Sequence, residues 1–177
     1  DPNAPPSQTN KAIEAKMRNS RETIYEAQFF PGNTNWVTWM FGRKLDDWSF
    51  WFDFLKWITP SRDLIRTFNS EPGDKRYQQT VVFYECDWNM YYPANNYAFM
   101  YKCRSGYNSI IKLRYADILL LKAEALIDKG DYNKAAQIIN RTRTRAGLNS
   151  LPASAAADKE SITQAYLKER RLELALE

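Results

Sequence analysis

A helical hairpin predicted between residues 113 and 148 constrains the fold of this chain more than any other feature. Apolar or small side chains recur every three or four residues from Leu113 to Ile127, which places them on one face of a helix. Gly130 can adopt the left-handed conformation that ends a helix, and Asp131 can accept from the free N–H groups that open the next one. A second helix then extends towards Gly147. The sequence therefore predicts two helices folded back on each other through a Gly-Asp turn.

The faces of the two helices predict how the hairpin is buried. The first helix has its main row at Leu113, Ala116, Leu120, Ala123 and Ile127, a second apolar row at Ile118, Leu119, Leu121, Ala125 and Leu126, and a narrow polar side at Lys122, Asp128 and Lys129. We expect such a helix to be buried on more than one side. The second helix is expected to bury Tyr132, Ala135, Ala136, Ile139 and Thr142. This pattern is typical of a tetratricopeptide-like hairpin, which stacks on neighbours, although any antiparallel helix pair shares the periodicity.

The remaining segments predict a mainly α-helical fold with irregular aromatic-rich loops and a few short strands. A short helix is expected from Pro60 to Phe68 and a turn from Asn69 to Asp74. Tyr77–Tyr84 is expected to be extended, and a short strand near Ile110 to lead into the hairpin. A last amphipathic helix, with capping-box spacing at Ser161 and Gln164, is expected to run to Glu177 without a stop signal and so to be truncated.

Composition excludes several kinds of chemistry. The chain has no histidine, which removes the commonest general base and transition-metal ligand, so we expect no metal and no cofactor. Its two cysteines, Cys86 and Cys103, are too few for a Cys-rich zinc site. They would close a disulfide loop of about 16 residues, adding roughly 3 kcal/mol, or remain two independent thiols. A net charge of +4, with both signs interspersed, indicates no polyanionic partner.

Aromatic side chains are 15% of the chain and are concentrated before the hairpin. Five of the six tryptophans lie between Phe29 and Trp57. Trp51, Phe54 and Trp57 recur at helical spacing and are expected in the core of a helix over residues 47–58. Trp36, Trp39 and Trp48 instead flank Gly32, Gly42 and polar residues without a sustained period, as expected of loops, where binding residues often lie.

Flat aromatic rings among hydrogen-bonding side chains suit a sugar, because a pyranose presents C–H groups to a ring and hydroxyls to polar partners. At this density, however, most aromatic residues fill a core. The leading candidates for sugar stacking are Trp36, Trp39 and Trp48, with Asn33, Asn35, Arg43 and Asp46 as polar partners and Trp88, Tyr91 and Tyr92 as a second group.

Motifs along most of residues 22–177 resemble the SusD/RagB family. They are Leu113–Ala125, Ile139–Asn140 and Arg143–Gly147 in the hairpin, Glu22–Glu26, Pro60–Phe68 and Asp74–Arg76 upstream, and Glu169–Glu173 downstream. The chain departs from the family in its length of 177 residues and in lacking the Gly-x-Arg-aromatic segment expected after the last helix. The resemblance implies the C-terminal part of such a protein, with three regions: a polar Pro-rich lead at 1–20, an aromatic-rich region at 21–110 and a tetratricopeptide-like helical region at 111–177.

The resemblance also implies a function. SusD-like proteins are surface-exposed lipoproteins of the Bacteroidetes outer membrane that bind nutrients, usually oligosaccharides, and pass them to a TonB-dependent, SusC-like transporter. They are binding proteins and not enzymes. No window of this chain is apolar enough to span a bilayer, so membrane attachment is expected only through a lipid anchor outside residues 1–177. The resemblance does not locate the sugar site residue by residue.

Three other functions are compatible with the residues. A tetratricopeptide-type interaction module without sugar binding is the main alternative. A glycosidase would need two carboxyl groups at a defined separation, and the spacing of Asp46, Asp47, Asp53, Glu85 and Asp87 indicates no pair. Arginines with aromatic rings can stack single-stranded nucleic acid, but Arg141, Arg143 and Arg145 are more simply cations near a helix C-terminus, so we expect no nucleic-acid partner.

Overall fold

The computed structural model describes residues 20–29, 35, 59–84, 92–93, 95–102 and 109–177. It divides into two compact units. One comprises Asp1–Arg62, Gln78–Lys112 and Leu176–Glu177, and the other Asp63–Tyr77 and Leu113–Ala175. Helices dominate the described residues and the strands are short, which confirms the predicted fold class. None of the helices in these ranges is long and apolar enough to cross a membrane. The domain boundaries drawn from the sequence stay a prediction.

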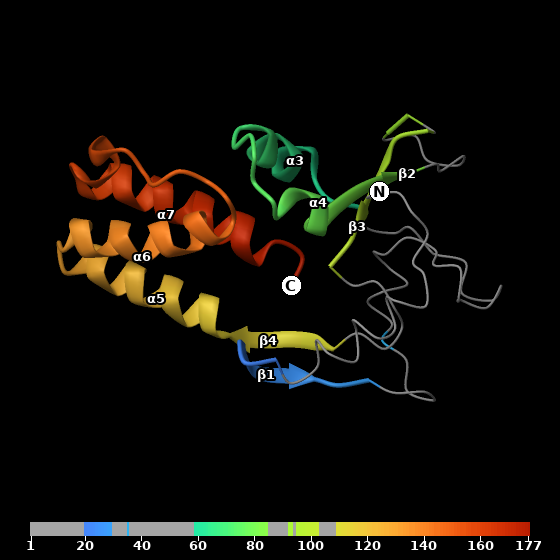
Figure 1. Cartoon of the computed structure of the whole chain (residues 1–177), viewed down its shortest axis with the longest axis horizontal. Coiled ribbons are helices and arrows are strands. Elements are labelled where there is room, and N and C mark those ends of the chain that lie inside the picture. Colours follow the sequence, from blue (N-terminus) through green and yellow to red (C-terminus); the bar gives the residue numbers. More distant parts are fainter. Residues whose placement is uncertain (1–19, 30–34, 36–58, 85–91, 94, 103–108) are drawn as a thin grey trace. The chain divides into compact units, whose positions relative to one another are not determined.

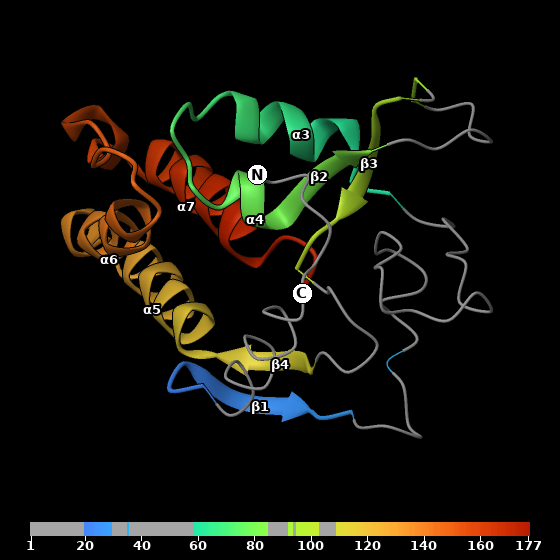
Figure 2. The same ribbon diagram turned by 45° about the vertical axis from the view of Figure 1, so that its right-hand side comes forward.

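The second unit contains the predicted hairpin. Its helices are α5 (Tyr115–Asp128) and α6 (Tyr132–Arg145), followed by a 3₁₀ turn at Ala153–Ala156 and by α7 (Lys159–Leu174). α5, α6 and α7 lie side by side in both views (Figure 1, Figure 2). Their shared core is apolar and contains Leu120, Ala123, Ile127, Ala135, Ile138, Ile139, Ile162 and Tyr166. The hairpin prediction is confirmed.

Two glycines end the hairpin helices as the sequence predicts. Gly130 has φ +81°, and the N–H of Asp131 donates to the carbonyl of Leu126, which is the bond of a Schellman cap. The Asp131 carboxylate then accepts from the N–H of Lys134 and opens α6. Gly147 repeats the cap at φ +86°, and a Cβ there would lie 3.0 Å from the Lys75 side chain. The positive φ therefore favours glycine at position 147, whereas the flexible Lys75 side chain would need only a small shift to admit a Cβ.

The outer face of α5 corrects the expected burial. Ala116, Leu120, Ala123 and Ile127 are buried, but Tyr115, Ile118 and Leu121 are 47%, 39% and 42% exposed. The expectation that the second apolar row is covered is wrong for Ile118, Leu121 and Ala125, because α6 and α7 pack on the opposite face. α5 therefore carries an apolar stripe, formed by Tyr115, Ile118 and Leu121, on its exposed face.

Two further expectations needed correction at helix ends. α7 begins at Lys159, and the carboxylate that caps it is that of Asp158, which accepts from the N–H of Ser161 at 2.8 Å. Ser161 is thus not the cap that the Ser161 and Gln164 spacing predicted. α7 ends at Leu174 and does not continue to Glu177. Its last residues turn away through Leu176, which has φ 62°.

The segment before the hairpin begins with α3 (Arg62–Asn69), as predicted, and the turn from Asn69 to Asp74 follows. Residues Tyr77–Thr80 form the short helix α4, so the extended conformation predicted there is wrong. The N–H of Tyr77 bonds to the carbonyl of Asp74, and its ring stacks on Phe68 with centroids 5.0 Å apart. These local contacts favour a helical turn over the strand that the following residues form.

The first unit contains two small sheets. β2 (Val81–Tyr84) pairs antiparallel with β3 (Tyr97–Met100), with Val81 opposite Met100. β1 (Thr23–Ala27) pairs with β4 (Ile110–Arg114), which continues along the chain into α5 and confirms the predicted strand near Ile110 (Figure 1). Buried Val82, Tyr97 and Phe99, with Tyr92 and Tyr101 against them, form the core of the β2–β3 sheet.

Candidate functional site

Most residues predicted to bind sugar lie outside the described ranges. These are Trp36, Trp39, Trp48, Asn33, Arg43, Asp46, Trp88 and Tyr91, together with Cys86 and Cys103 of the predicted disulfide. Asn35 and Tyr92 are described. Asn35 is fully buried. The sugar site and the disulfide stay predictions.

Tyr92 is held within the first unit by three contacts. Its hydroxyl donates to the carbonyl of Pro60 at 3.0 Å. The Arg62 guanidinium lies 5.4 Å from the centre of the ring, and Tyr97 meets the ring at 67° with centroids 5.6 Å apart. These contacts fix the ring beside the β2–β3 sheet, in a position where it supports neighbouring residues.

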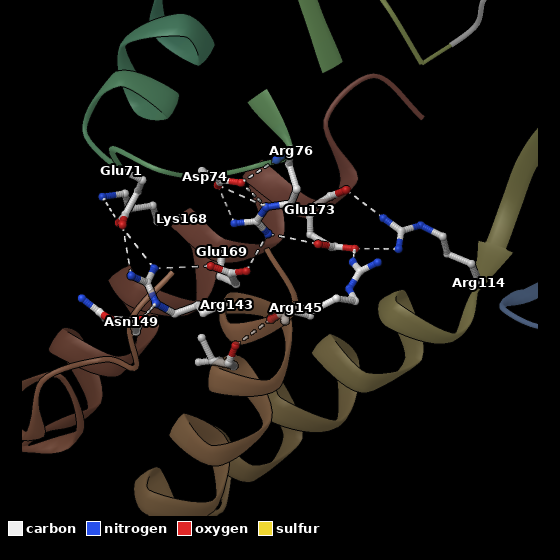
Figure 3. A network of polar contacts seen from close by, with 12 residues as sticks. Glu71, Asp74, Arg76, Arg114, Arg143, Arg145, Asn149, Lys168, Glu169 and Glu173 are labelled. Carbon is white, nitrogen blue, oxygen red and sulfur yellow. Dashed lines mark hydrogen bonds and ion pairs between the residues drawn. The ribbon is translucent and has the colours of Figure 1, made fainter. Parts of the chain in front are cut away.

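The largest cluster of charged side chains in the described residues lies in the second unit (Figure 3). Arg76 is at its centre. Its Nε and Nη2 donate to the Asp74 carboxylate at 2.9 and 2.7 Å, while Nη1 donates to Glu169 at 2.6 Å and to Glu173 at 3.0 Å. One guanidinium therefore joins the turn after α3 to two carboxylates of α7.

Arg143 joins the same turn to the end of α6. Its Nη2 donates to Glu71 at 3.0 Å, its Nε donates to the carbonyl of Asn149, and its Nη1 lies 3.5 Å from Glu169. Lys168 of α7 pairs with Glu71 at 2.6 Å. Glu71 thus receives one cation from α6 and another from α7.

Glu173 is the third junction of the cluster. Arg114, at the start of α5, donates through Nη1 to the Glu173 carboxylate and through Nη2 to its carbonyl, both at 2.7 Å. Arg145, at the end of α6, also pairs with this carboxylate. The cluster of Glu71, Asp74, Arg76, Arg114, Arg143, Arg145, Lys168, Glu169 and Glu173 is called the charge network below.

The electrostatics of the network keep the carboxylates of Glu71 and Glu173 ionised. Burial alone would raise the pKa of Glu173, but hydrogen bonds and charges from Arg114, Arg145 and Arg76 outweigh burial and lower the pKa to about 2. Burial alone would raise the pKa of Glu71, but hydrogen bonds from Arg143 and Lys168 lower it. Burial alone would lower the pKa of Arg76, but its hydrogen bonds to Asp74 and Glu169 raise it.

This arrangement is suited to holding segments together. Acid–base catalysis would require a group whose pKa is tuned towards neutrality, whereas the pKa values of Glu71, Glu173 and Arg76 are shifted away from it. Its carboxylates face guanidinium groups, which occupy the positions a metal ion would need, and the described residues contain no cluster of three or more metal-ligating side chains. We therefore assign the network a structural role.

Acid is expected to destabilise the second unit through Glu173. Because its pKa falls from an ordinary 4.5 to about 2 on folding, its contribution is fully present above pH 4.5 and is lost as the pH falls towards 2. The shift corresponds to about 3 kcal/mol. Urea unfolding at a series of pH values measures this slope, and Glu173→Gln should flatten it. An unchanged slope in that variant would assign the acid sensitivity to other carboxylates.

Sequence reasoning missed how the network assembles. Arg143 and Arg145 were interpreted as cations near a helix C-terminus, yet Arg143 is only 8% exposed and pairs with residues far away in the chain. The sequence contains a signal of this network. Three of the motifs that resemble the SusD/RagB family supply most of its residues: Asp74–Arg76, Arg143–Gly147 and Glu169–Glu173. The structure brings these three motifs together.

The fold defines the class of protein first. The chain resembles a SusD-superfamily protein from Bacteroides vulgatus, with a TM-score of 0.62, 19% identity, and coverage of 89% of this chain and 38% of that structure. It also resembles a SusD-like protein from Bacteroides fragilis, with a TM-score of 0.57, 21% identity, and coverage of 91% and 42%. At such identities these likenesses show a SusD-type fold.

Similarity to the SusD family is also found in the sequence of the C-terminal part of the chain. Residues 102–177 match the SusD family. Over 75 residues the chain is 39% identical to the SusD-like protein P38 of Formosa agariphila, a match that covers 39% of this chain and 15% of that protein. These matches agree with the resemblance to the SusD/RagB family that the motifs of the chain predicted. It spans less than half the length of the relatives it matches.

Proposed function

We propose that this chain is part of a surface glycan-binding protein that captures an oligosaccharide as a nutrient. The match of residues 102–177 to the SusD family carries this proposal. The aromatic-rich composition between Phe29 and Trp57 supports it independently, since a fold of stacked helices needs no such segment. The function is binding without catalysis.

The same proposal includes the cellular location of the protein and its partner. A SusD-type protein would be held at the outer surface of the outer membrane by a lipid anchor outside residues 1–177. It would pass its ligand to a TonB-dependent, SusC-like transporter that serves polysaccharide utilisation. Neither a cofactor nor a nucleic acid enters this function.

Trp36, Trp39 and Trp48 remain the proposed stacking platform. A tryptophan offers a large rigid face to the C–H groups of a pyranose and buries much apolar area with few rotatable bonds. Asn33, Arg43 and Asp46 would supply hydrogen-bond partners for the hydroxyls, whereas Asn35, the other predicted partner, is fully buried and does not face solvent. Trp88, Tyr91 and Tyr92 form the second group of candidates, in which the contacts of Tyr92 favour a supporting position.

Replacing Trp36, Trp39 and Trp48 together by alanine is expected to weaken oligosaccharide binding at least tenfold, or about 1.4 kcal/mol. The reason is the loss of three flat apolar faces. Isothermal titration calorimetry against a panel of oligosaccharides measures the change. Alanine at Lys122 and Lys129, which are exposed on α5, is the control and should leave affinity intact. Equal affinity in the triple variant and the parent would exclude this platform.

A protein-interaction module without sugar binding is the second candidate, and one observation favours it. The apolar stripe of Tyr115, Ile118 and Leu121 on α5 is exposed, as expected of a helical hairpin that packs on another element. The hairpin would then dock the transporter or another part of the protein. No oligosaccharide binding across the panel would favour this function, and release of reducing ends from a glycan would favour a hydrolase over both.

A further inference from the structure

The segment Asp63–Tyr77 is attached to the rest of the second unit in a different way from the three helices. α5, α6 and α7 share an apolar core, in which Leu120, Ile139 and Ile162 are fully buried. The hydrogen bonds and ion pairs that the structure shows from the segment to α6 and α7 are charged or made by the backbone. The segment also buries two apolar side chains of its own, Leu64 and Phe68. The aromatic pair of Phe68 and Tyr77 is internal to the segment.

Four ties attach the segment. Arg76 bonds Glu169 and Glu173, Glu71 receives Arg143 and Lys168, and Asp63 pairs with Arg171 at 2.5 Å. The N–H of Lys75 donates to the carbonyl of Ala146 at 2.9 Å. All four lead to the end of α6 or to α7.

The apolar core and the charged ties differ in the free energy needed to separate them. Separating an apolar core exposes its surface to water, at roughly 25 cal/mol for each Å². Separating ion pairs as a whole returns both partners to water, and regained hydration offsets most of the lost attraction. Removing only one partner is far more costly, because the other stays buried and unpaired. Release of the segment would expose Leu64 and Phe68 but would leave the larger core of α5, α6 and α7 intact, so it is cheaper than unfolding of the helices.

We propose that the network contacts of Glu71 and Arg76 form a charged latch, which opens and releases the segment Asp63–Tyr77 while α5, α6 and α7 stay folded. Small cooperative units of this kind open below the free energy of global unfolding. The latch thus gives the segment a stability separate from that of the helical core in the same unit.

Native-state hydrogen exchange tests the latch in the unmodified protein. The Lys75 amide reports docking, because its bond to Ala146 exists only when the segment is in place. Amides in the middle of α5 and α6 report the core. We expect the Lys75 amide to exchange at least tenfold faster than these core amides, through an opening that depends little on denaturant. Exchange of both sets at the same rate and with the same denaturant dependence would overturn the proposal.

A pair of matched variants tests which contacts close the latch. Glu71→Gln removes the charge that receives Arg143 and Lys168, and should speed exchange of the Lys75 amide about tenfold while leaving the core amides unchanged. Glu160→Gln is the same substitution at an exposed position on α7 and should change neither set. If Glu71→Gln speeds both sets equally, or neither, the latch does not exist as a separate unit.

Discussion

Replacing Glu173 by alanine is expected to lower the free energy of unfolding by about 3–5 kcal/mol, the range for one partner removed from a buried ion pair. The Glu173 side chain is 2% exposed and faces Arg76, Arg114 and Arg145. Arg114 is itself buried. In the variant its charge would lose the Glu173 carboxylate but would stay in a place with little access to water. Urea denaturation followed by circular dichroism measures the loss.

An exposed ion pair provides the control for this prediction. Asp128 and Lys159 join α5 to α7 at 3.0 Å, but their side chains are 69% and 60% exposed. Solvent screens such a pair, so Asp128→Ala should cause no measurable loss of stability. A Glu173→Ala protein as stable as the parent would mean that water or a rearranged carboxylate replaces Glu173.

Leu120→Ala is expected to cost about 2–5 kcal/mol, as deletions of a fully buried leucine do. Leu120 is 0% exposed at the centre of the α5–α6–α7 core, where neighbours on three helices cannot all move in to fill the space. The adjacent Leu121 is 42% exposed on the other face of the same helix. Leu121→Ala should therefore cost less than about 1 kcal/mol.

The two leucines form a matched pair, since both substitutions delete the same atoms from the same helix. Chemical denaturation of both variants gives the comparison. Equal losses would show that the stripe of Tyr115, Ile118 and Leu121 is covered in solution, and would contradict the exposed face described above.

The hairpin was predictable because its signals are local. Periodicity over residues 113–127 assigns the buried face, and the cap at Gly130 with Asp131 depends on neighbours only a few residues away. The pattern could not show that the second apolar row stays largely uncovered, since that depends on where α6 and α7 lie.

The charge network was not predictable in this way. Arg76 and Glu169 are 93 residues apart, and their spacing in the sequence contains no information about distance in space. Two other errors are local. Ser161 fits a capping box, but Asp158 reaches the free N–H groups first, and Tyr77 suits a strand, but its backbone bond to Asp74 starts a helical turn. The predicted sugar platform is not tested, because most of its residues lie outside the described part of the chain.

The contacts of Arg76 limit which residues can replace it without loss of the charge network. Its Nε, Nη1 and Nη2 each donate, and together they reach three carboxylates lying in different directions. A lysine carries the same charge, but it concentrates its donors on one nitrogen and cannot reproduce the planar fork. A replacement that conserves net charge at this position would therefore still break the contacts with Asp74 or those with Glu169 and Glu173. Sequence variants judged conservative by charge alone would be misjudged here.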